Sequence, residues 1–256
     1  MKSSRSERLK PDKFALVSES WNKFIKNCLL CYKPGQDITV DEQLFPSKAR
    51  CNFTQFMANK PDKFGIKFWM LADVKLKYMC NAFPYLGKDE LRPEEEAHPE
   101  NVVIKLTEPY LRRGRNVTID NFFTSLKLAE RLKAMQTSIV GTMKRTRKEI
   151  PAVVCNSKES LHSSKILKSE SGTTLTVYQE KRNKNVLALS TQHSNVSIGT
   201  GEKQLPETIQ YYNSAKYGVD VVDQMARKYT VSTACRRWPV HVYCLTYLIW
   251  QVSVLG

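Results

Sequence analysis

The sequence predicts an α/β fold: a mixed β-sheet with flanking helices and a β-rich insertion. Short apolar segments with strand-like patterns recur between residues 38 and 143. An amphipathic helical segment separates the last two of these strands, as in a parallel addition to a sheet. The 256 residues, 41% of them hydrophobic, suffice for a sizeable core and exclude a disordered chain.

Residues 1–36 are expected to form a helical segment. Trp21, Phe24 and Ile25 recur there with near-helical spacing. Pro34, followed by glycine, interrupts the pattern and predicts the end of the segment.

Residues 37–146 are expected to form the first part of the sheet core. Ile38 and Val40 alternate with polar residues, which predicts a first strand. Residues 65–72 are almost continuously apolar and predict a second strand, and residues 77–83 predict a third. The short polar link between the last two favours an antiparallel hairpin.

A strand-helix-strand unit follows these strands. Residues 116–120 and 138–143 have strand patterns. Residues 126–135 form an amphipathic helix between them, and Ser125 is a suitable N-cap. Three antiparallel strands followed by such a parallel addition are the ribonuclease H-like plan.

The rest of the chain divides into three further parts. Residues 147–206 predict a β-rich insertion, with a hairpin formed by 174–178 and 185–189. Residues 207–226 return to the core as its last helix, and 227–256 form a C-terminal helical segment. The end of the chain lacks charged side chains, but its proline and polar residues favour a helix buried in protein over a membrane span.

Four aspartates stand out by position. Asp41 lies on the first predicted strand, Asp120 ends the strand before the amphipathic helix, and Asp220 and Asp223 lie one turn apart on the late helix. Each acid alone is an ordinary strand, turn or surface residue. In the ribonuclease H-like plan, however, the two strands are neighbours and the late helix packs across them. We therefore expect Asp41, Asp120 and Asp220 to meet at one point.

Such a group of carboxylates suits phosphodiester chemistry. Two divalent cations about 4 Å apart can activate an attacking oxygen and stabilise the leaving oxygen. Mg²⁺ prefers carboxylate and water ligands, and Mn²⁺ accepts the same set. The expected cofactor is a pair of divalent cations, Mg²⁺ or alternatively Mn²⁺.

The net charge of +15 predicts a polyanionic partner, first nucleic acid and second an anionic membrane surface. Two groups of cations are candidates for binding DNA phosphates: Lys144, Arg145, Arg147 and Lys148, and then Arg236 and Arg237. The first group also fits a nuclear localisation signal, and the sequence does not separate these two interpretations.

Ordered motifs extend across nearly the whole chain. They are V-D-E-Q-L at 40–44, K-A-R at 48–50, N-K-P-D-K-F-G-I-K at 59–67, P-Y-L-G at 84–87, N-V-T-I-D-N-F-F-T-S at 116–125, V-G-T at 140–142, K-E-I-P at 148–151, G-V-D-V-V-D-Q-M at 218–225 and R-R-W-P at 236–239. Together they resemble the piggyBac transposase family far more specifically than any single acid does.

The resemblance implies a ribonuclease H-like catalytic domain with three catalytic, metal-binding aspartates. Residue by residue, these fall on Asp41, Asp120 and Asp220, and a further functionally important acid falls on Asp223. Members of the family cut DNA at transposon ends and insert it at TTAA targets. Residues 1–36 and those after about 226 resemble flanking pieces of the family's helical dimerisation and DNA-binding region. We also expect a nuclear protein, and a homodimer in a longer natural form.

Three hypotheses remain open at this point. The first is a Mg²⁺-dependent transposase, and the second is a domesticated, catalytically idle DNA-binding or chromatin-associated protein derived from one. The third is a non-functional fragment. The family's helical region normally begins upstream of Met1, and a Cys-rich zinc-binding domain normally follows the core, which here stops at Gly256. We therefore expect retained chemistry with reduced recognition of transposon ends.

Overall fold

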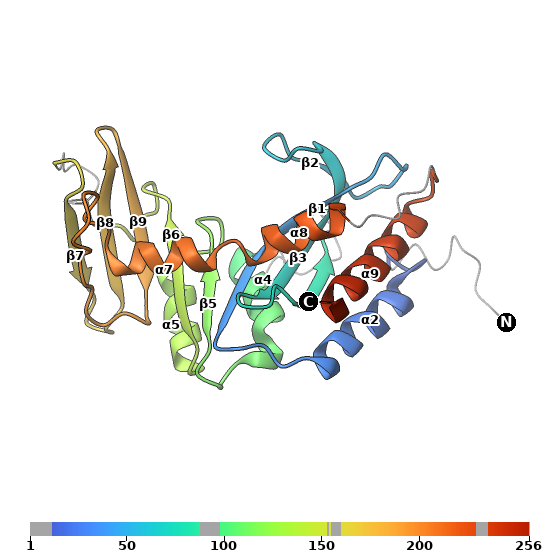
Figure 1. The fold of residues 1–256 in the computed structure, drawn as a ribbon, viewed down its shortest axis with the longest axis horizontal. Coiled ribbons are helices and arrows are strands. Elements are labelled where there is room, and N and C mark those ends of the chain that lie inside the picture. The colour runs from blue at the N-terminus through green and yellow to red at the C-terminus, as the bar shows by residue number, and fades with distance from the viewer. Residues whose placement is uncertain (1–11, 88–97, 153, 155–159, 229–234, 256) are drawn as a thin grey trace. The chain divides into compact units, whose positions relative to one another are not determined.

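The computed structural model describes residues 12–87, 98–152, 154, 160–228 and 235–255, with side chains up to Thr246 (Figure 1). The chain forms two compact units. The first contains Met1–Pro34, Asp41–Ala97 and Gly218–Gly256, and the second contains Gly35–Val40 and His98–Tyr217.

The first unit packs helices against antiparallel strands. Its described elements are α2 (Ser18–Cys31), the later part of β1 (Asp37–Pro46), β2 (Thr54–Phe56), β3 (Phe64–Asp73), β4 (Met79–Pro84), α8 (Gly218–Lys228) and α9 (Trp238–Leu255). Strand β3 pairs antiparallel with both β2 and β4. The predicted hairpin between β3 and β4 is therefore confirmed.

Aromatic side chains hold this unit together. The ring of Phe14 stacks on that of Trp238, with ring centroids 5.7 Å apart. The ring centroids of Trp21 and Phe68 are 4.8 Å apart. The indole N–H of Trp21 also donates to the carbonyl oxygen of Ala82 on β4, at 3.3 Å. Burial of such large rings joins α2 and α9 to β3 and β4 in one hydrophobic core.

The second unit is built on a parallel sheet that becomes antiparallel. Its elements are residues 37–40 of β1, α4 (Pro99–Thr107) with the 3₁₀ turn Glu108–Tyr110, β5 (Asn116–Ile119), α5 (Leu126–Ala134), β6 (Ser138–Met143), β7 (Ser164–Lys168), β8 (Thr174–Lys181), β9 (Lys184–Ser190) and α7 (Glu207–Ala215). Strands β1, β5 and β6 are parallel, whereas β9 pairs antiparallel with β6. Helix α7 packs on β6 and β9 (Figure 1).

Within the described part of the chain, hydrogen bonding links nine strands in the order β2-β3-β1-β5-β6-β9-β8-β7, with β4 on β3. Strand β1 belongs to both units, because its residues 37–40 pair with β5 and its later residues lie in the first unit. The predicted mixed α/β fold is confirmed. The predicted hairpin of the insertion is also confirmed as β8 and β9.

The structure differs from the prediction in several elements. The short strands β2 and β7 were not predicted. The late helix is divided into α7 and α8. The strands of the predicted insertion extend the sheet from β6. Part of the expected leader helix, residues 1–11, lies outside the described residues.

The C-terminal helix was expected to be buried in protein, and its first turns do contribute to the core. Trp238, Val242 and Leu245 of α9 are buried there. Within the described part of the chain, no helix combines the length and the apolar character needed to span a bilayer.

Candidate functional site

Asp120 begins a tightly hydrogen-bonded turn directly after β5. Its carboxylate Oδ1 accepts a hydrogen bond from the backbone N–H of Phe122 at 2.9 Å. Its carbonyl oxygen accepts two more, from the N–H of Thr124 at 3.2 Å and from the Thr124 hydroxyl at 2.7 Å. The turn therefore fixes both the main chain and the side chain of Asp120.

The predicted N-cap of α5 is confirmed and connects the same turn to a buried acid. Ser125 Oγ accepts from the N–H of Leu128 at 3.1 Å and donates to Glu100 Oε1 at 2.5 Å. Glu100 is 7% exposed and lies in the first turn of α4. The hydroxyl thus satisfies a helix N–H and the buried carboxylate at once.

Asp41 follows the residues of β1 that pair with β5. The last register pair of these parallel strands is Val40 with Ile119, and each is followed in the chain by an aspartate. Asp41 is half-buried, and its Oδ1 accepts from the N–H of Glu42 at 2.7 Å. Asp41 belongs to the first unit and Asp120 to the second.

The two aspartates of α8 have different surroundings. Asp220 is exposed in the first turn, and it lines a hollow of about 550 Å³ together with Glu42 and Asp223. Asp223 accepts a hydrogen bond from Gln43 Nε2 at 3.1 Å and pairs with Arg227 Nε at 3.0 Å. The carboxylate of Asp223 is therefore held by neighbours on β1 and α8.

The donors suit a hard divalent cation in their chemistry, because carboxylate oxygens are the ligands that Mg²⁺ prefers. Among the residues that the structure describes, however, no three His, Cys, Asp or Glu side chains are grouped closely enough to hold a metal ion. The convergence of Asp41, Asp120 and Asp220 stays a prediction.

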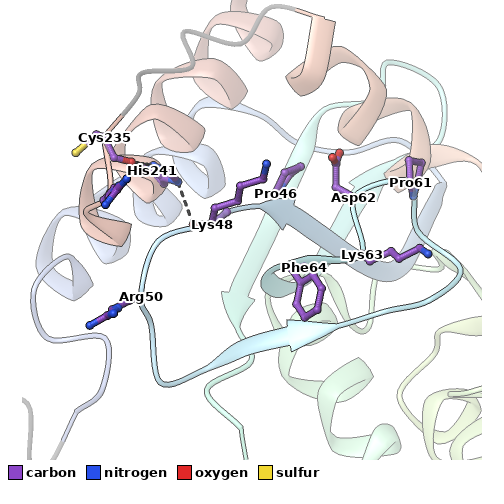
Figure 2. Close-up of a pocket in the computed structure, with 11 residues that line it drawn as sticks. Pro46, Lys48, Arg50, Pro61, Asp62, Lys63, Phe64, Cys235 and His241 are labelled. Atoms are coloured by element: carbon purple, nitrogen blue, oxygen red, sulfur yellow. Dashed lines mark hydrogen bonds between the residues drawn. The ribbon is translucent and has the colours of Figure 1, made fainter.

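A second hollow in the first unit is lined by cations (Figure 2). It measures about 1040 Å³, and the cationic side chains on its lining are Lys48, Arg50, Lys63 and Arg236. Its carboxylate, Asp62, accepts a hydrogen bond from Arg227 at 2.6 Å, so its charge is partly balanced. We call this site the basic hollow. It suits an anionic ligand.

His241 connects two sides of the basic hollow. Because a carbonyl oxygen only accepts, the Nε2–H of His241 donates to Cys235 O at 2.5 Å. Its Nδ1 then accepts from the Ser47 hydroxyl at 3.0 Å. The ring thus joins the segment that carries Arg236 to the loop that carries Lys48 and Arg50.

The cations predicted to bind DNA lie at two places. Lys144, Arg145 and Lys148 are exposed after β6, whereas Arg147 is half-buried and donates to the carbonyl oxygen of Phe122 at 3.2 Å. Arg236 and Arg237 are exposed, and Arg236 lines the basic hollow. Their role in DNA binding stays a prediction.

Sequence reasoning noted Lys48 and Arg50 in the K-A-R motif and Lys63 in the motif at 59–67, but it did not assign any of the three to a binding site. They come from two separate loops and are joined only by the fold. The one available signal was that all three lie in or beside the ordered motifs between residues 41 and 67.

Parallel strands β1, β5 and β6 within a mixed α/β sheet with flanking helices define the class of proteins with a ribonuclease H-like fold. The family described as Transposase IS4 matches residues 1–251, and the chain belongs to this family. The predicted ribonuclease H-like fold and the predicted relation to piggyBac transposases are both confirmed.

The relatives agree with this assignment. The piggyBac transposable element-derived protein 3 of Homo sapiens is 26% identical over 245 residues, which cover 89% of this chain and 41% of the relative. The chimeric ERCC6-PGBD3 protein of Homo sapiens is also 26% identical over 245 residues, covering 89% of this chain and 23% of that protein. The chain therefore spans less than half the length of these two relatives.

A solved structure gives a closer comparison. The cryo-EM structure of a piggyBac transposase synaptic complex with hairpin DNA is 36% identical, with a TM-score of 0.91. The match covers 99% of this chain and 53% of that one. At this level of identity and coverage, the likeness extends over nearly all of the present chain.

Proposed function

We propose that the chain provides the catalytic core of a piggyBac-type transposase, which cuts and joins DNA strands at TTAA sites. The single observation that carries this proposal is the register of β1 and β5, in which Val40 pairs with Ile119 and each precedes an aspartate. Asp220, exposed on α8, supplies the third carboxylate. Membership of a transposase family supports the same reaction class.

The proposed cofactor is a pair of divalent cations, Mg²⁺ or Mn²⁺, held by Asp41, Asp120 and Asp220. When bound, such ions activate the attacking oxygen and stabilise the leaving oxygen. The chain's own contribution is to supply hard oxygen donors and to fix their orientation. The hydrogen bonds that Asp41 accepts from Glu42 N–H and Asp120 from Phe122 N–H serve that purpose.

The proposed partner is DNA, and the proposed location is the nucleus. The solved relative is a complex with hairpin DNA, which supports this partner. The basic hollow and the cations after β6 offer phosphate contacts, which give affinity without sequence readout. We also propose that a longer natural form acts as a homodimer.

A cleavage assay tests the proposed reaction. The purified chain should nick DNA with TTAA-flanked ends in the presence of Mg²⁺ or Mn²⁺, and Asp120→Asn should abolish nicking. Glu130→Gln is a matched control, because Glu130 is exposed on α5 of the same unit. Nicking that persists in Asp120→Asn would come from a contaminating nuclease and would contradict the proposal.

A second candidate function is DNA binding without catalysis, as in a domesticated transposase. It is favoured by the exposed cations after β6 and in the basic hollow, which can contact phosphates whether or not a metal ion is bound. In this case the chain should bind DNA equally with and without divalent cations, and no nicking should occur. Removal of one phosphate-binding side chain, for example by Arg236→Met, should reduce the slope of log K against log salt by about 1.

A further inference from the structure

The turn that carries Asp120 is closed by one buried hydroxyl. Thr124 is fully buried, and its Oγ1 donates to the carbonyl oxygen of Asp120 at 2.7 Å. The backbone N–H of Thr124 donates to the same oxygen at 3.2 Å. Phe123, also fully buried, anchors the middle of the turn in the core of the second unit.

The neighbouring strand leaves space for this hydroxyl only because it has a glycine there. Gly141 on β6 is the register partner of Ile119, the residue directly before Asp120. A Cβ at Gly141 would lie 2.3 Å from Thr124 Oγ1 and 2.9 Å from the carbonyl oxygen of Ile119. Both distances are far below van der Waals contact, and the second involves backbone that cannot rotate away.

We infer that Thr124 and Gly141 are positioning residues for the Asp120 carboxylate. The inference rests on the proposed function, in which this carboxylate holds a divalent cation. Hydroxyl and glycine form a matched pair, because the Thr124 hydroxyl fixes the carbonyl of Asp120 and Gly141 leaves the volume that the hydroxyl fills. The Asp120 carboxylate then accepts the N–H of Phe122, two residues along the same turn. Neither residue needs to touch metal or DNA to act in this way.

The same contacts predict which substitutions keep the fold. In Thr124→Val the shape is nearly retained, and the Asp120 carbonyl still accepts the N–H of residue 124, so no buried acceptor is left without a partner. Thr124→Ser retains the hydroxyl and should keep the turn intact. Gly141→Ala should displace the hydroxyl even though Thr124 itself is unchanged.

Titration of the full chain with Mn²⁺ by calorimetry or electron paramagnetic resonance tests the inference without relying on activity. Removal of a group that orients a ligand typically weakens metal affinity by roughly 10- to 100-fold. We expect a decrease in this range for Thr124→Val and Gly141→Ala, and near wild-type affinity for Thr124→Ser. Thr142→Val is the matched control, because Thr142 lies next to Gly141 on β6 and its hydroxyl donates to Tyr212 at 3.4 Å.

Hydrogen exchange of the unaltered protein gives a second readout that does not depend on a variant folding. If the turn is positioned in advance, the amides of Phe122 and Thr124 should already exchange slowly before Mn²⁺ is added. Protection that appears only with Mn²⁺, or wild-type Mn²⁺ affinity in folded Thr124→Val, would overturn the inference.

Asp120→Asn separates the two proposals. If it leaves Mn²⁺ binding unchanged, the proposed function has failed. If it abolishes binding while Thr124→Val does not weaken it, only the positioning role has failed.

Discussion

Arg227 joins helix α8 to the loop that carries Asp62 in the first unit, and removing its charge gives a quantitative prediction. Its Nε donates to Asp223 at 3.0 Å and its Nη1 to Asp62 at 2.6 Å. The side chains of Arg227, Asp223 and Asp62 are 27%, 18% and 52% exposed, respectively. Arg227→Met retains most of the apolar stem and removes both charged hydrogen bonds.

The magnitude follows from these exposures. The pair with half-exposed Asp62 is screened by solvent and should contribute about 0.2–1 kcal/mol. The bond to the largely buried Asp223 is charge-assisted and should contribute about 1.5–3 kcal/mol, although Gln43 remains as a second donor to this carboxylate. We expect Arg227→Met to lower the free energy of unfolding of the first unit by about 2–4 kcal/mol.

Tryptophan fluorescence in urea measures this change selectively. The sequence has 4 Trp residues, at positions 21, 69, 238 and 250, and all belong to the first unit. With an m-value of about 2 kcal/mol/M, the midpoint should fall by about 1–2 M. Lys26→Met makes the same type of change on the exposed face of α2 and should leave the midpoint nearly unchanged.

A double-mutant cycle with Asp223→Asn identifies the partner. The coupling energy between Arg227 and Asp223 should be about 1.5–3 kcal/mol, because their bond is the more buried of the two. A coupling energy within about 0.3 kcal/mol of zero would show that the pair is no more than a surface contact, and the reasoning from burial would be refuted.

Three further predictions concern single side chains. At about pH 8, iodoacetamide should label exposed Cys31 well before buried Cys28, because burial raises the pKa of the Cys28 thiol to about 11. Equal rates of labelling of the two thiols, measured by mass spectrometry, would contradict this. Burial lowers the pKa of His193, so the unfolded chain takes up a proton first on acidification, and stability should fall as the pH drops below about 6.5. Thermal unfolding of His193→Asn should show a flatter pH dependence, and an unchanged slope would exclude His193 as its source. Ser125→Ala should lower the free energy of unfolding by about 1–2 kcal/mol, because α5 loses its N-cap. A further decrease is expected because buried Glu100 loses the hydrogen-bond donor of Ser125. Ser125→Thr keeps the hydroxyl, so thermal unfolding should show that most of this stability is retained.

The long strands were predictable because buried strands have either alternating apolar and polar residues or a continuous run of apolar residues. Strand β3 is buried over nearly its whole length, and β5 over all of it. Strands β2 and β7 lack that signal. β2 has three residues and none is buried, and β7 has no fully buried residue. The break between α7 and α8 was missed because helical periodicity continues across it, although Gly218 marks the start of the second helix.

The candidate site was predictable in its residue types but not in its partners. The acids could be placed on strands and helices from sequence position alone. The neighbours that fix Asp223 could not, because Gln43 lies 180 residues away in the chain. Asp62, which shares Arg227 with Asp223, lies 165 residues from that arginine. Such contacts arise only when distant segments pack, and no local pattern reports them.

The distribution of the three catalytic candidates over two units leads to a last prediction. Asp41 and Asp220 belong to the first unit, and Asp120 belongs to the second. If all three hold the same cations, Mn²⁺ should increase the stability of the first unit, and this increase should depend on Asp120 of the second unit. At a concentration of about 100 times the dissociation constant, binding should add about 2.7 kcal/mol to the free energy of unfolding measured by tryptophan fluorescence. Asp120→Asn should remove this increment and leave metal-free stability nearly unchanged, whereas Glu130→Gln should preserve it. An increment that survives Asp120→Asn would place the metal on the first unit alone and would exclude a site shared by all three acids.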